Sequence, residues 1–144
     1  MDLFLPAPLR RCAALLLLFF CLAGLAHAAP VVVGHKNLAG EKIDAPTLKA
    51  VFLGKKTAWD HAGRVVLAVL KGDTADAFLK ATVEMSASQF ANHWRRLAMT
   101  GGGTSPRFFD KPDDLRRFVA ETPGAIGFLD AASVDDSILT LNGT

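Results

Sequence analysis

The sequence predicts a single three-layer α/β domain with a mainly parallel sheet and helices on both faces. Short apolar runs rich in β-branched residues alternate along the chain with stretches of helical periodicity. Most segments between the predicted strands are about a dozen residues or longer, which favours parallel pairing through crossover helices. The first 28 residues differ in character from the rest of the chain. The other 144 − 28 = 116 residues are enough for one domain with one hydrophobic core.

This distinct segment lies at the N-terminus. Arg10 and Arg11 precede an uncharged apolar run over residues 12–26, and Ala26 and Ala28 supply the small residues that precede a cleavage site. A basic head, an apolar middle and an A-x-A end are typical of a secretory signal peptide. The apolar run is about 15 residues, shorter than the ~20 of a membrane span, so a retained anchor helix is the alternative. We expect cleavage after Ala28 and a periplasmic location.

Cleavage would divide the chain into a signal peptide at residues 1–28 and a domain at residues 29–144. Both cysteines, Cys12 and Cys21, belong to the signal, so the domain would contain neither a disulfide nor a reactive thiol. The 16 basic and 14 acidic residues of the whole chain are nearly balanced. This balance argues against nucleic acid as a partner and against a polybasic membrane surface. We expect no stable membrane insertion once the signal is removed.

The first half of the domain predicts two buried strands that flank a helix. Residues 30–35 contain three consecutive valines between Pro30 and Gly34, as in a short strand. Asp44 can cap the following helix, and Gly54 can end it. Residues 64–70 form a second continuous apolar run, which predicts a strand buried on both faces.

The second half predicts three helices and two more strands. One helix begins at Asp73 and Thr74 with an apolar stripe behind it, and the next begins at a capping box formed by Ser86 and Gln89. The apolar face of this second helix predicts that Trp94 is buried, and we expect Trp59 to close its loop onto the fold. A further helix over residues 110–122 has an acidic first turn and stops before a proline. The remaining strands are expected at residues 124–130 and 137–143.

Few side chains offer catalytic or metal chemistry. The histidines of the domain, His35, His61 and His93, are not spaced as ligands of one metal ion. No G-x-S-x-G elbow occurs, so a serine nucleophile has no support. The stretch TGGGTSP, residues 100–106, resembles a phosphate loop but follows a helix and lacks the required lysine, which favours a helix C-cap. We therefore expect no enzyme activity, no metal and no cofactor.

Four short motifs occur in a familiar order: FLGK at residues 52–55, Trp59, TGGG at residues 100–103 and PGAIGF at residues 123–128. In this order the chain resembles phosphate-type periplasmic substrate-binding proteins of ABC transporters, especially their short single-lobe relatives, over residues 31–141. The resemblance implies the type-2 periplasmic-binding fold. Members that clamp phosphate hold it between two α/β lobes, and this chain resembles the second lobe.

The turn from Lys71 through Gly72 and Asp73 to Thr74 is the candidate anion site. A strand there leads into a helix N-terminus, where free backbone N–H groups can hold an anion. The resemblance places Lys71 near the position where phosphate binders carry an arginine, ahead of a Ser-Gly-Thr triplet that this chain does not keep. Asp73 puts a carboxylate where the anion would lie and can cap the helix itself.

These observations predict a secreted, non-enzymatic binding or interaction domain. It would be an accessory or sensory component of the cell envelope that recognises a protein partner, with at most weak binding of phosphate or another anion. The alternative is the substrate-binding component of an ABC-type phosphate or anion uptake system, completed by a second lobe or by dimerisation.

Overall fold

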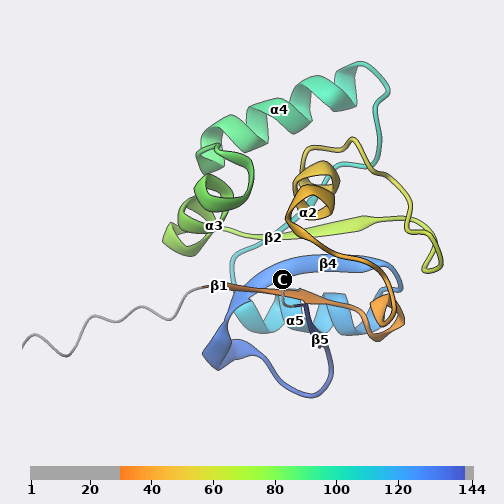
Figure 1. Cartoon of the computed structure of the whole chain (residues 1–144). Helices are drawn as coiled ribbons and strands as arrows, with labels where there is room; N and C mark the ends of the chain where they lie inside the picture. Colours follow the sequence, from red (N-terminus) through yellow and green to blue (C-terminus); the bar gives the residue numbers. More distant parts are fainter. Residues whose placement is uncertain (1–29, 142–144) are drawn as a thin grey trace, which may run out of the picture.

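A computed structural model describes residues 30–141 (Figure 1). The elements follow in the order β1 (Pro30–Gly34), η1 (Lys36–Leu38), α2 (Ala45–Phe52), β2 (Val66–Leu70), α3 (Asp73–Val83), α4 (Ala87–Met99), β3 (Arg107–Phe109), α5 (Pro112–Glu121), β4 (Ala125–Asp130), η2 (Ala131–Ser133) and β5 (Leu139–Leu141). The predicted signal peptide lies outside the described residues. Within them, no helix has the length and apolar character needed to cross a membrane.

The strands form one sheet in the order β3-β2-β4-β1-β5. Strand β2 runs parallel to β3 and β4, whereas β1 runs antiparallel to β4 and β5. The sheet described by residues 30–141 is therefore mixed, where a mainly parallel sheet was predicted. The segment between β1 and β2 is long enough to return the chain in either direction, so its length does not determine the orientation of β1.

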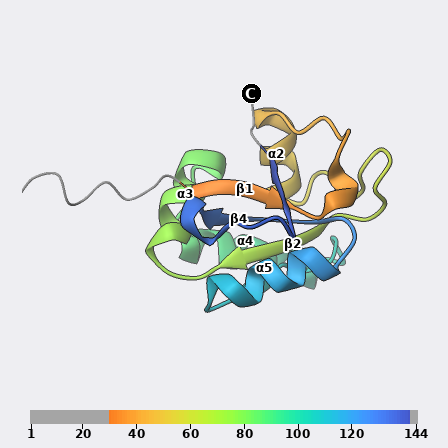
Figure 2. The ribbon, with the colours of Figure 1, turned by 90° about the horizontal axis from the view of Figure 1, so that it is seen from below.

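Helices cover both faces of the sheet, as predicted. Helix α5 packs under one face, and α2 and α3 pack over the other, with α4 stacked beyond α3 (Figures 1 and 2). The three-layer α/β arrangement is confirmed.

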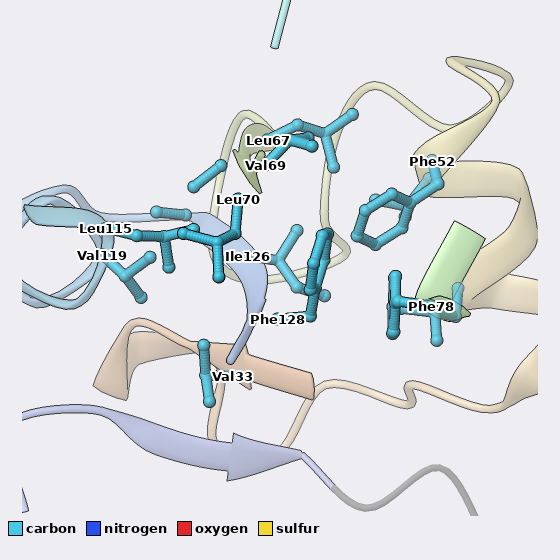
Figure 3. Packing of buried hydrophobic residues seen from close by; sticks show 14 of the residues in the cluster. Val33, Phe52, Leu67, Val69, Leu70, Phe78, Leu115, Val119, Ile126 and Phe128 are labelled. Atoms are coloured by element: carbon cyan, nitrogen blue, oxygen red, sulfur yellow. The ribbon is translucent and has the colours of Figure 1, made fainter. Parts of the chain in front are cut away.

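The core has one apolar layer on each side of β4 (Figure 3). On the α2 and α3 side, the ring of Phe128 stacks on Phe78 with centroids 4.2 Å apart, and Phe52 lies 5.3 Å from Phe78. On the α5 side, Leu115 and Val119 are fully buried beside the sheet. Burial of large side chains of this kind stabilises the fold by roughly 1.5–3 kcal/mol each.

Both tryptophans are buried, as the helix stripe and the loop position predict, and each is 5% exposed. The Trp94 indole Nε1 donates to the carbonyl oxygen of Phe52 at 3.0 Å, which ties α4 to the end of α2. Trp59 Nε1 donates to the carbonyl oxygen of Gly124 at 2.9 Å. This second bond closes the loop before β2 onto the start of β4.

Two of the predicted helix caps are confirmed and one is wrong. The Asp44 carboxylate accepts the Thr47 N–H at 3.0 Å, and hydrogen bonds from Thr47 lower the pKa of this carboxyl. Ser86 and Gln89 form the predicted capping box at the start of α4. The cap of α3 is Gly72, not Asp73, and no side chain of the described chain caps this helix. A cap residue needs non-helical backbone, and Asp73 is already the first helical residue.

Strand β3 was not predicted. Its three residues, Arg107–Phe109, follow the Gly-rich stretch directly and pair with β2 in parallel register. Three residues are too few for a periodicity to be recognised. The Gly-rich stretch itself ends α4, as predicted: Thr100 is the C-cap, and Gly101 follows with φ +77°.

Candidate functional site

The predicted turn, residues 71–74, lies at the carboxyl end of the parallel strands. Strand β2 leads into α3 on one face of the sheet, and its parallel neighbour β3 leads into α5 on the other face (Figure 1). In α/β sheets, ligands bind in the crevice formed where two neighbouring strands send their connections to opposite faces. The topology therefore gives this turn a position suited to ligand binding.

Lys71 joins the two strands at this point. Its backbone N–H donates to the Phe109 carbonyl oxygen at 2.9 Å, and its Nζ lies 3.3 Å from Asp110 Oδ1. The two side chains are 57% and 81% exposed, so water screens the pair strongly. Asp110 was not predicted as part of the site. Its place directly after a strand would have been the signal, but β3 itself had not been recognised.

The start of α3 presents backbone donors together with carboxylates. Gly72 takes φ +105°, and its carbonyl oxygen accepts the N–H groups of Ala75 at 3.1 Å and Asp76 at 3.3 Å. The earlier N–H groups, on Asp73 and Thr74, have no intrahelical acceptor, as at any helix start. Asp73 and Asp76 both lie in this first turn, where their negative charge already complements the helix dipole. An incoming anion would meet these carboxylates as well as the donors.

A small pocket of about 280 Å³ opens beside the turn. It is bounded by α3, α4 and β3, and most of its lining is apolar: Val69, Leu70, Ala75, Leu79, Ala87, Phe90, Ala91 and Phe108, with Lys71, Gly72 and Ser88. Phe108 is 42% exposed, unusually high for a large apolar side chain. The sequence analysis missed this pocket, because its wall includes β3.

Two of the histidines, His35 and His93, make hydrogen bonds to backbone groups. His93 Nε2 lies 2.8 Å from the carbonyl oxygen of Leu53, and His35 Nδ1 accepts the N–H of Asn37 at 3.0 Å. Within residues 30–141, no three His, Cys, Asp or Glu side chains come together as metal ligands would.

Two solved structures that match this fold are described as phosphate-transport binding proteins. The chain matches an ABC-type phosphate transport receptor from Vibrio cholerae with a TM-score of 0.52 and 11% identity, over 81% of this chain and 48% of that chain. It matches a putative phosphate ABC transporter substrate-binding protein with bound phosphate from Clostridium perfringens with a TM-score of 0.59 and 16% identity, over 79% and 44%. No protein-family model and no curated protein sequence matches the chain.

The chain therefore spans about half the length of the structures that it matches. Its fold is that of about one lobe of a phosphate ABC transporter substrate-binding protein. The predicted resemblance is confirmed at the level of the fold, and the matching structures are those of binding proteins.

Proposed function

We propose that the protein is a secreted binding domain without enzymatic activity, acting as an accessory or sensory component of the cell envelope. The observation that carries the proposal is the match in fold to one lobe of phosphate-type substrate-binding proteins. Secretion rests on the signal pattern that ends at Ala28. A protein partner of the envelope is its expected target, and anions bind only weakly at residues 71–74.

The weak anion affinity follows from the magnitudes involved. A micromolar ligand requires about −8 kcal/mol of binding free energy. An exposed helix N-terminus contributes roughly 0.3–1 kcal/mol, and an exposed lysine pair about 0–1 kcal/mol. Lys71 is already paired with Asp110, and Asp73 repels an anion at the helix start. These contributions correspond to millimolar or weaker binding.

Isothermal titration of the purified mature protein with phosphate tests this affinity. We expect no micromolar binding, and any millimolar signal should weaken as the salt concentration rises. Lys71→Gln should reduce that signal further, whereas Lys80→Gln, on the outer face of α3, should leave it unchanged. A micromolar dissociation constant that Lys71→Gln abolishes would show that the turn is a strong phosphate site.

One observation favours the alternative function, a component of an anion uptake system that works with a second lobe or as a dimer. Phe108 is exposed beside an apolar pocket at the same end of the sheet as Lys71. A second lobe placed at this end of the sheet would bury both Phe108 and Lys71. Sedimentation velocity separates the two functions: the accessory domain should sediment as a monomer across concentrations. A dimer that phosphate strengthens and Phe108→Glu dissolves would support the uptake component instead.

Export is tested separately by cell fractionation and N-terminal sequencing. The protein should appear in the periplasmic fraction and begin at Ala29. Replacing Arg10 and Arg11 by glutamate should retain it in the cytoplasm, because the basic head of a signal peptide is needed for export. Membrane-bound protein that still begins at Met1 would support the retained anchor helix.

A further inference from the structure

A second and larger pocket lies at the opposite end of β2 from Lys71. Its volume is about 730 Å³, within the 300–1,000 Å³ typical of small-molecule sites. It is enclosed by the end of α2, the loop over residues 54–65 with the start of β2, the Gly-rich loop after α4, and Trp94 of α4 itself. The end of α2 and the Gly-rich loop lie at the same end of the domain (Figure 1).

The charge of the pocket is positive. Lys56 and Arg64 are the charged residues that line it, and no carboxylate belongs to the lining within residues 30–141. Lys56 Nζ lies 3.3 Å from Asp60 Oδ1, outside the lining. The Arg64 guanidinium forms no salt bridge with any described carboxylate. A guanidinium offers a planar set of donors that matches the two oxygens of an acidic group.

The loop that carries these cations is held in place from outside the pocket. The Glu41 carboxylate accepts the N–H groups of His61 at 2.7 Å and Ala62 at 2.9 Å. A β-bridge pairs Ala58 with Arg64 and fixes the backbone from which the Arg64 side chain projects. The Glu41 carboxylate is thus engaged by the loop backbone. The same contacts give the backbone that carries Arg64 a defined position.

The rest of the lining is suited to an apolar, planar body. Val51, Val65, Leu67 and Trp94 contribute apolar surface. The six-membered edge of the Trp94 indole faces Gly54, where an added Cβ would lie 2.9 Å from Trp94 Cη2. Gly54 and Gly103 both lie close to this edge, and Trp94 as a whole is 5% exposed, so the indole forms a packed part of the pocket wall. The indole cannot turn away freely, since its Nε1 donates to Phe52.

We propose that this pocket binds a small organic anion: an aryl carboxylate or sulfonate whose acidic group pairs with Arg64 and whose ring fills the pocket beside Trp94. Inorganic phosphate would leave the apolar surface of this pocket unfilled. The ligand proposed here is therefore different from the phosphate considered for the turn at Lys71. The proposal goes beyond the function proposed above and depends neither on export nor on the turn at residues 71–74.

Two matched probes test it on the full mature protein: naphthalene-1-sulfonate and the neutral naphthalene-1-sulfonamide. Titration followed by ¹⁵N NMR should shift the Trp94 indole and Gly103 amide signals and leave the Gly72 amide unchanged. The sulfonate should bind at least tenfold more tightly than the sulfonamide. Arg64→Gln should remove most of that difference, while Arg117→Gln, the same loss of charge at an exposed position of α5, should preserve it.

A second variant tests the location independently of charge. Thr104→Trp places a large side chain at the lining of the pocket and should weaken both probes by tenfold or more. Equal affinity for the two probes would identify an apolar cavity only and would overturn the assignment to anions. Shifts centred on Gly72, or binding that neither Arg64→Gln nor Thr104→Trp changes, would overturn the site itself.

Discussion

The two ends of β2 are built in different ways. At its amino end, two buried indoles each donate to a backbone carbonyl from a distant part of the chain, Trp59 to Gly124 and Trp94 to Phe52. At its carboxyl end, the exposed pair of Lys71 and Asp110 joins β2 to the residue after β3, and the Asp76 carboxylate accepts the Ala87 N–H at 2.8 Å in a part-buried bond. The two indole bonds at the amino end are buried, whereas the ion pair that joins distant segments at the carboxyl end is exposed.

Because of this difference, the contacts that stabilise the fold most lie away from the candidate anion turn at Lys71. A buried hydrogen bond costs the full desolvation of its partners when it is broken, whereas an exposed ion pair exchanges easily with water. The fold is therefore anchored at the end with the larger pocket, and the carboxyl end can change its surface chemistry with little risk of unfolding. Four substitutions test this view by their effects on the free energy of unfolding.

Replacing Trp94 by alanine should cost about 3–5 kcal/mol, the usual range for truncating a buried aromatic side chain. That is a large share of a stability of roughly 5–15 kcal/mol. The change would also leave the Phe52 carbonyl without its donor. The urea midpoint measures the loss, and Met99→Ala on the same helix is the control, because Met99 is 82% exposed. An unchanged midpoint for Trp94→Ala would contradict the packing of α4.

Replacing Gly124 by alanine should cost roughly 2–5 kcal/mol, of which about 1–2 comes from left-handed backbone and ~1–3 from overpacking. Gly124 has φ +79°, and an added Cβ would collide with the carbonyl oxygen of Arg64. Gly63→Ala is the matched control: its φ is +81°, but nothing lies within 4 Å of the added atom. If both variants lose the same stability, crowding at Gly124 is not the cause.

Replacing Ser86 by alanine should cost about 0.5–2 kcal/mol, because the capping box of α4 is lost. This cap lies near the carboxyl end of β2, since the next two residues, Ala87 and Ser88, line the small pocket beside Lys71. Asp73→Ala at the start of α3 should cost no more than the ~0.3–1 kcal/mol of a helix-dipole interaction. Urea midpoints rank the two variants, and a larger loss for Asp73→Ala would mean that its carboxylate does cap α3.

Replacing Lys71 by glutamine should change stability by about 0–1 kcal/mol, the range for an exposed ion pair. A double-mutant cycle with Asp110→Asn measures the coupling between the two side chains. The coupling should fall as salt is raised from 0.1 M to 1 M, since the screening length shortens from about 10 Å to about 3 Å, comparable with the 3.3 Å between the two charged groups. A coupling as large as the effect of Ser86→Ala, and insensitive to salt, would show that the carboxyl end is less open than described.

Local patterns in the sequence were enough to predict most elements. The caps at Asp44 and Ser86 and the burial of Trp94 were all predicted correctly. Each depends on residues within one or two turns of one another, so spacing alone carries the information. The strand-to-helix turn at residues 71–74 was predicted for the same reason. The cap of α3 was missed by one residue, because glycine at a cap leaves no side-chain signal.

Local sequence patterns thus specify the α/β class, the helices with most of their caps, the buried tryptophans and the place of the candidate turn. The tertiary structure alone decided the direction of β1, the presence of β3, the pairing of Lys71 with Asp110 and the pocket around Arg64. These features join segments distant along the chain. Their stability depends on which surfaces meet after folding, and no local spacing encodes that choice.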